Sequence, residues 1–138
     1  MSEAFRLIEG ALYTTLSGDS NLNTTLGVGG RVFDTQAPSG SAEPYVIFQI
    51  TAGGDENDSP RRAVDVMVRV EAISSVQDTA RKISSRIDAL LHNQELTITG
   101  WSNYATQNNR PVNLVDTVAG KQWYRKGAFY RLRASING

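Results

Sequence analysis

The fold is decided by residues 63–91, which read AVDVMVRVEAISSVQDTARKISSRIDALL. Valine recurs at every second position from Val64 to Val70, and most of the residues between them are polar. A period of two is typical of a strand that buries one face and exposes the other. We therefore predict a strand over Val64–Ala72 in an antiparallel sheet that is covered on one face only.

The second half of the same stretch predicts the helix that covers the valine face. Its apolar residues follow a helical period and are Val76, Ala80, Ile83, Ile87, Leu90 and Leu91. Ser75 with Asp78 three residues later resembles a capping box, and Asp78 is favourably placed to pair with Lys82 one turn on. The strand and this helix together predict the core of the domain.

Toward the N-terminus the pattern predicts another helix over residues 3–16, with Phe5, Ile8, Leu12 and Leu16 on one face. Asp19 precedes a short helical segment that ends at the glycines of residues 27–30. Two strands are then predicted, over residues 31–33 and 45–50, with a long loop between them.

Toward the C-terminus the sequence predicts further β-structure. Leu96, Ile98 and the aromatic residues of 101–104 indicate short strands, and alternation over residues 128–136 predicts a closing strand. The strand order between residues 94 and 121 does not follow from the sequence. Two helices and about five strands predict an α+β fold, a mostly antiparallel sheet covered by two helices.

The composition predicts a single soluble domain over residues 1–138. The chain has 40% hydrophobic residues, 14 basic against 14 acidic residues, and no cysteine. No apolar run approaches the roughly 20 residues that a membrane span needs, and the first residues lack the pattern of a secretory signal. Disulfides and thiolate sites are excluded, and we expect neither membrane insertion nor export.

The residues that carry catalytic and metal chemistry are scarce. His92 is the only histidine and follows an apolar helix, so we interpret it as polar cover of the helix end and not as a catalytic base. Residues 55–60 begin like a calcium loop, but Pro60 stands where glycine is needed and Val66 stands where glutamate is needed. The sequence therefore predicts no enzyme, no metal site and no cofactor.

Charge is unevenly distributed along the chain. Five cations and no acid lie between positions 121 and 133, namely Lys121, Arg125, Lys126, Arg131 and Arg133. Acids gather in two earlier loops, with Glu43 in the long loop and Asp55, Glu56 and Asp58 in the predicted turn 53–60. Arg61 and Arg62 follow this turn. Such polarity is typical of a solvated surface or of a contact in which one subunit's basic strand meets its neighbour's acidic loop.

A third interpretation of the basic strand is binding of nucleic acid. The stretch Lys126–Tyr130 partly matches the strand motif on which RNA bases stack, although Ala128 occupies a position that needs an aromatic ring. A small nucleic-acid-binding module is therefore the alternative function, and a hydrolase that uses His92 is a more distant one.

Residues 11–51, ALYTTLSGDSNLNTTLGVGGRVFDTQAPSGSAEPYVIFQIT, carry a resemblance to a known family. In the order of helix, short helix, glycine turn, RVFD, AP loop and PYVIF, the stretch resembles the tail-completion or tail-terminator family of long-tailed bacteriophages. The later strand, the helix ISSRIDALLH and the closing FYRLRA strand are compatible with it.

The resemblance implies a tail-terminator-like fold and a structural function in the virion. Members of that family form a hexameric ring on the finished tail tube, end its growth and present a surface for the head connector. The implied partners are other copies of the chain, the tail-tube protein and the head-completion protein, with DNA passing through the ring without sequence-specific binding. Assembly would take place in the bacterial cytoplasm, without membrane or cofactor.

The long loop from Asp34 to Pro44 has two interpretations. A ring subunit must touch several partners, so this loop and the predicted turn 53–60 are candidate contact segments that project from a rigid sheet. Alternatively, the loop is a crossover between strands that are not adjacent, and its prolines prevent stray edge pairing.

Overall fold

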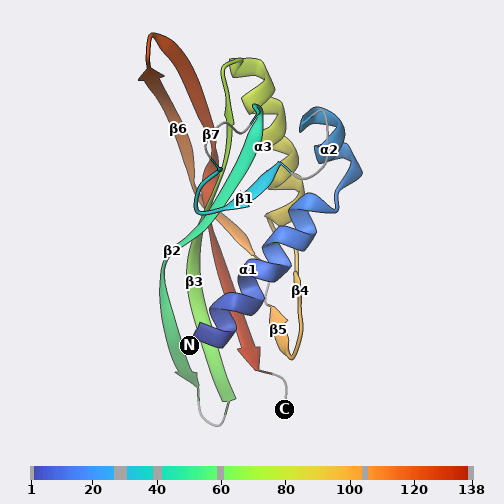
Figure 1. The fold of residues 1–138 in the computed structure, drawn as a ribbon. Coiled ribbons are helices and arrows are strands. Elements are labelled where there is room, and N and C mark those ends of the chain that lie inside the picture. The colour runs from blue at the N-terminus through green and yellow to red at the C-terminus, as the bar shows by residue number, and fades with distance from the viewer. Residues whose placement is uncertain (1, 27–30, 39–41, 59–60, 104–105, 137–138) are drawn as a thin grey trace.

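The computed structural model describes residues 2–26, 31–38, 42–58, 61–103 and 106–136 (Figure 1). Within these residues the helices are α1 (Ser2–Ser17), α2 (Ser20–Leu26) and α3 (Gln77–Leu91). The strands are β1 (Val32–Asp34), β2 (Tyr45–Asp58), β3 (Arg61–Ser74), β4 (Thr97–Ile98), β5 (Trp101–Asn103), β6 (Gln107–Val118) and β7 (Lys121–Ile136). None of the described helices is long and apolar enough to span a membrane.

The described strands form one seven-stranded sheet in the order β1-β2-β3-β7-β5-β4, with β6 also beside β7. β1 and β2 are parallel and every other described pair is antiparallel. β7 is long enough for two strands to share its second edge: β6 follows it from Lys121 to Arg131, and β5 pairs with residues 134–136. The prediction of an α+β fold with a mostly antiparallel sheet is confirmed.

The long loop between the first two strands is explained by the parallel pairing of β1 with β2. Val32 lies opposite Val46, and Asp34 lies opposite Phe48. Parallel neighbours cannot be joined by a tight turn, because the chain must return to the end from which the first strand started. The loop is therefore a crossover, as one interpretation proposed, but it joins adjacent strands.

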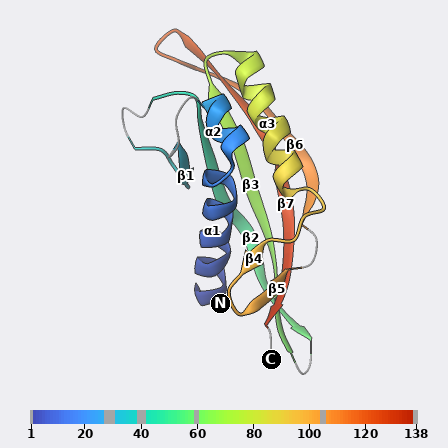
Figure 2. The same cartoon turned by 90° about the vertical axis from the view of Figure 1, so that its right-hand side faces the viewer.

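The valine face of β3 forms the centre of the core. Val64, Val66, Val68, Val70 and Ala72 are all at most 1% exposed, as the alternation predicted. All three helices lie on this side of the sheet (Figures 1 and 2). The helices bury their apolar stripes against it, with Ile8, Leu12 and Leu16 from α1 and Ala80, Ile83, Ile87 and Leu91 from α3. None of the described helices covers the opposite face of the sheet (Figures 1 and 2).

The predicted capping box at the start of α3 is wrong. The cap position is Val76, which is extended, has no side-chain cap and is 54% exposed, so it is not part of the buried stripe. The Ser75 hydroxyl instead donates a hydrogen bond to the Glu43 carboxylate, which also accepts from the Ser75 backbone N–H at 2.9 Å. Glu43 thereby ties the crossover loop to the junction of β3 and α3.

The short second helix is confirmed, and Asp19 positions it. The Asp19 carboxylate accepts a hydrogen bond from the Leu22 backbone N–H at 2.8 Å, as a residue at the start of a helix does. The same carboxylate accepts two hydrogen bonds from Arg86 of α3, at 2.8 and 2.9 Å. Residues 27–30, predicted to end this helix, lie outside the described part of the chain.

The predicted turn over residues 53–60 is wrong, because β2 continues to Asp58 and β3 begins at Arg61. Gly53 and Gly54 read as turn residues but lie inside the strand. A Cβ at Gly53 would come within 2.7 Å of the Val66 Cα, so the position requires glycine for close strand packing and not for a turn. The result is a long β2–β3 hairpin.

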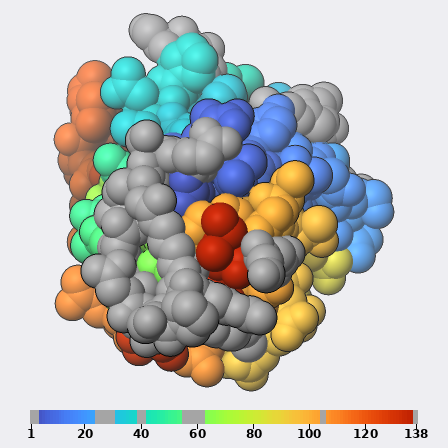
Figure 3. Space-filling model, turned by 90° about the horizontal axis from the view of Figure 1, so that it is seen from below, coloured from blue at the N-terminus to red at the C-terminus, as the bar shows by residue number. Residues whose placement is uncertain are grey.

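The second long hairpin consists of β6 and β7, and β6 was not predicted from the sequence. Residues 107–118 contain three asparagines and Pro111, and within β6 only Val112 is buried, so no hydrophobic alternation marks them. Pairing along β7 makes them a strand. The β2–β3 and β6–β7 hairpins lie at opposite ends of the molecule (Figure 1). Seen from the end below, β7 finishes beside α1 and the β4–β5 hairpin (Figure 3).

Candidate interaction surface

The face of the sheet that the described helices leave uncovered is built from strands of both hairpins. The residues of β3 that alternate with the buried valines lie on it, from Asp65 to Ile73. Antiparallel partners share a face, so the side chains of Arg125, Phe129 and Arg131 from β7 lie there as well. We call this surface the open face.

A buried carboxylate lies at the centre of the open face. Glu71 is fully buried, and one of its oxygens accepts two hydrogen bonds from the Arg125 guanidinium. Arg125 also donates to Asp116 of β6 at 3.2 Å, and Arg69 lies 3.9 Å from the same Glu71 oxygen. Burial opposes the charge on Arg125, but its bonds to the two carboxylates outweigh that effect and raise its pKa. The burial of Glu71 could not be predicted from the sequence, because Glu71 occupies a polar position of the alternation.

Other cations of β7 also have partners within the chain. The Arg131 guanidinium donates to both oxygens of Asp65, at distances from 2.5 to 3.1 Å. The ammonium of Lys121 lies 3.0 Å from Glu43 and 4.5 Å from the centre of the Trp123 ring. Of the other predicted site cations, Lys126 donates to Asn113, and Arg133 is half-buried. Much of the positive charge of β7 is therefore balanced inside the subunit.

The acidic residues of the prediction lie at the other end of the molecule. Asp55, Glu56 and Asp58 lie at the end of β2, and Arg61 and Arg62 begin β3 directly opposite, with Asp58 paired with Arg61. The placement of these five side chains is outside the described part of the structure. The fold does not bring them near Lys121, because the two hairpins point in opposite directions (Figure 1).

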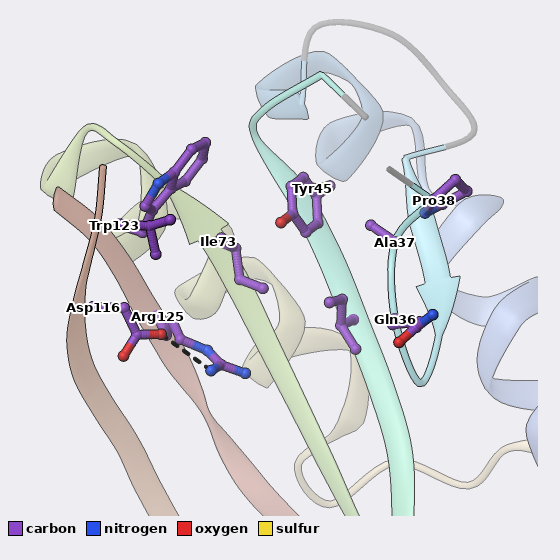
Figure 4. A pocket seen from close by; sticks show the side chains of 10 residues that line it. Gln36, Ala37, Pro38, Tyr45, Ile73, Asp116, Trp123 and Arg125 are labelled. Atoms are coloured by element: carbon purple, nitrogen blue, oxygen red, sulfur yellow. Dashed lines mark hydrogen bonds and ion pairs between the residues drawn. The ribbon is translucent and has the colours of Figure 1, made fainter. Parts of the chain in front are cut away.

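A groove of about 560 Å³ lies on the open face beside the crossover loop (Figure 4). Its floor is made by Ile47 and Ile73, which are buried although they face away from the helices. Tyr45 and Trp123 stand on either side of Ile73. The remaining lining residues are Gln36, Ala37 and Pro38 from the loop and Asp116, Val118 and Arg125 from the second hairpin. This mixture of aromatic, apolar and paired charged groups is suited to a protein contact.

The features that suggested catalysis or base stacking have structural roles. His92 follows α3, and its Nδ1 accepts a hydrogen bond from the Asn108 backbone N–H at 3.0 Å. Tyr130 is 1% exposed and donates to Asp88 at 2.9 Å, and both burial and this bond raise its pKa. Ala128 is buried as well. The Tyr130 ring is therefore not available for stacking with nucleic-acid bases. Among the described residues, no group of three potential metal ligands occurs.

Comparison with known proteins decides the family. The model of the family Tail completion protein gp17 matches residues 10–131. The chain belongs to this family. The resemblance read from residues 11–51 is therefore confirmed. The tail completion protein family is structural and not enzymatic, which confirms the prediction that the chain is no enzyme.

Two solved structures have a similar fold. A chain of the "Virion of native gene transfer agent (GTA) particle" is 19% identical, with a TM-score of 0.75 over 91% of this chain and 92% of that chain. A second solved chain, whose name states no function, is 16% identical, with a TM-score of 0.58 over 96% of this chain and 95% of that chain. At these identities the likeness shows the fold alone. No curated protein matches the sequence.

Proposed function

We propose that this tail completion protein assembles into a ring of six copies on the end of the tail tube. The ring stops polymerisation of the tube and offers its outer surface to the head-completion protein. The observation that carries the proposal is the family match over residues 10–131. The solved relative from a gene transfer agent virion supports a place in the particle, because its fold matches nearly the whole chain.

The arrangement of the fold is suited to a ring. A cyclic ring above two copies needs two different surfaces on each subunit, since each copy contacts its two neighbours through unlike patches. The β2–β3 and β6–β7 hairpins lie at opposite ends and carry opposite charge in sequence. We infer that residues 1–138 act as one domain. We also infer that both hairpins contribute contacts to the ring. On β2 and β3 these are Asp55, Glu56, Asp58, Arg61 and Arg62, and on β7 they are Lys121, Arg125, Lys126, Arg131 and Arg133.

The in-chain ion pairs refine this proposal. Lys121 and Arg131 have half-exposed side chains, so carboxylates of a neighbour can approach them without breaking the pairs. Arg125 is more deeply placed and serves the fold of its own subunit first. Under this proposal DNA passes through the ring without sequence-specific contacts, and the protein resides in the neck of the virion after assembly in the host cytoplasm.

The test is removal of the gene that encodes the chain, followed by negative-stain microscopy of the particles. We expect tails of uncontrolled length, or normal tails that fail to join heads, and rescue by the wild-type chain supplied in trans. The variant His92→Ala should rescue equally well, because His92 only accepts a backbone hydrogen bond. Normal tail length and normal joining without the gene would refute the proposed function.

A further inference from the structure

The outer edge of β6 is a candidate pairing surface for another strand. β6 is hydrogen-bonded to β7 along one edge, and no described strand pairs with its other edge over Gln107–Val118. A strand of this length with a free edge presents a row of unpaired N–H and C=O groups, which is a template for a further strand.

The two halves of this edge differ in how they are protected. Residues 107–111 contain Arg110, Pro111 and a register shift between Asn108 and Arg110, three devices that prevent edge pairing. Residues 112–118, which read VNLVDTV, contain no proline, glycine, lysine or arginine. Their one charged group, Asp116, is held by Arg125. Only the second half of the edge is therefore open to a partner.

The open half also exposes apolar side chains on both faces. Leu114 is 51% exposed and lies opposite Arg125 on the open face, while Val115 is 50% exposed and lies opposite Tyr124 on the other face. Val118 is 60% exposed. A strand placed against this edge would cover side chains on both sides of the sheet, which a contact through one face alone would not do.

The matching edge is on β2 of the same chain. β1 pairs only with residues 46–48 of β2, so no described strand pairs with the outer edge of residues 51–58. A register shift lies at the start of this edge, between Ile50 and Ala52, and beyond it Ala52, Gly53 and Gly54 are small residues that leave the edge accessible. β2 and β6 lie on opposite sides of the β3–β7 pair.

We propose that residues 112–118 of β6 pair with the free edge of β2, residues 51–58, of a second copy of the chain. β2 and β6 run in opposite directions within one copy, because β3 and β7 lie between them in antiparallel order. Copies that keep the same orientation around a ring would therefore join in antiparallel fashion, the more stable pairing. This inference rests on the proposed ring.

Charge and register agree with this partner. The acids Asp55, Glu56 and Asp58 belong to the β2 edge, and five cations belong to β7, the strand that pairs with β6.

The two free edges lie at different heights along the sheet, since β6 runs beside the start of β7 and the free part of β2 runs toward the opposite end. A sheet closes on itself only when its strands tilt and the register shifts around the barrel, so the offset is of the kind that closure requires.

Engineered cysteines test the contact directly, because the chain has none of its own. Ala52→Cys is combined with either Leu114→Cys or Val115→Cys, whose side chains lie on opposite faces of the sheet, and purified tails are treated with a short bismaleimide. We expect one of the two pairs to give a ladder of covalent oligomers that ends at the closed ring. The matched control combines Ala52→Cys with Tyr13→Cys, an exposed position on α1, and should give no ladder.

A second measurement places a positive charge on the β6 edge, where it should prevent pairing with another strand. Val115→Lys should reduce ring assembly on tails at least tenfold, whereas Tyr13→Lys, at an equally exposed apolar residue, should leave it unchanged. Rings visible on tails with no ladder from either cysteine pair would overturn the edge pairing and leave the proposed ring intact. Absence of any ring on wild-type tails would overturn the proposed function and the pairing with it.

Discussion

At the scale of single residues, the open face depends on one buried carboxylate. Glu71 is fully buried and has Arg125 as its principal partner, while Arg125 also bonds to Asp116. The two residues are therefore not equivalent. Removal of Arg125 leaves a buried charge without its partner, whereas removal of the Glu71 charge leaves Arg125 with a second carboxylate.

We predict that Arg125→Met destabilises the fold by about 3–5 kcal/mol, the usual cost of breaking a buried ion pair from one side. Glu71→Gln should cost clearly less. The double variant Glu71→Leu with Arg125→Met should recover much of the loss, because apolar residues of similar size can replace a buried pair. Urea unfolding measures all three, and equal losses in the two single variants would contradict the assigned roles.

A second residue-scale prediction concerns pH. A hydrogen bond with the Asp34 carboxyl, burial and the charge of Asp34 raise the pKa of Glu9 from 4.5 to about 7. The folded state thus holds the Glu9 proton more tightly than the unfolded state. The contribution is fully present below about pH 4.5 and is lost as pH rises through about 7.

Glu9→Gln should therefore flatten the pH dependence of thermal stability between pH 4.5 and 7 and raise the melting temperature at pH 8 relative to wild type. Glu95→Gln removes a carboxylate at an exposed site and serves as the control. If the two variants give the same pH profile, the proton shared by α1 and β1 does not contribute to stability.

At the scale of elements, the sequence predicted those parts that periodicity governs. β3, α3, α1 and the second half of β7 follow from apolar spacing alone, because each buries one face against the core. β6 has a single buried side chain, Val112, so only its pairing with β7 makes it a strand. The glycines of β2 misled the prediction since the same residue type serves a tight turn and a close strand contact. The groove and the burial of Glu71 could not be predicted, because both depend on register across strands.

The face assignment of β3 gives the element-scale prediction. Val68→Asp places a carboxylate at a position that is 1% exposed, on the face of the sheet that the helices cover. We expect it to cost on the order of several kcal/mol, which is enough to unfold a marginal domain. Met67→Asp lies on the open face and should be far milder. Circular dichroism during urea unfolding distinguishes them, and equal damage from both would show that the faces do not differ.

At the scale of the whole molecule, the two hairpins give the subunit two distinct ends. The core lies between them and is shielded by helices on one side, so changes at a hairpin end can affect assembly while leaving the fold intact. The acids at the end of β2 belong to the proposed subunit contact, and their replacement removes no residue of the described core.

We predict that Asp55→Lys with Asp58→Lys leaves the monomer folded but weakens ring assembly. Each exposed ion pair contributes only about 0–1 kcal/mol, but every interface of a ring repeats the loss. The control, Asp78→Lys with Glu95→Lys, changes the net charge equally at exposed sites on α3 and after it. Negative-stain microscopy should show tails of uncontrolled length or unjoined tails only for the first variant. Normal tails there would remove these acids from the contact, and equal defects in both variants would assign the effect to net charge.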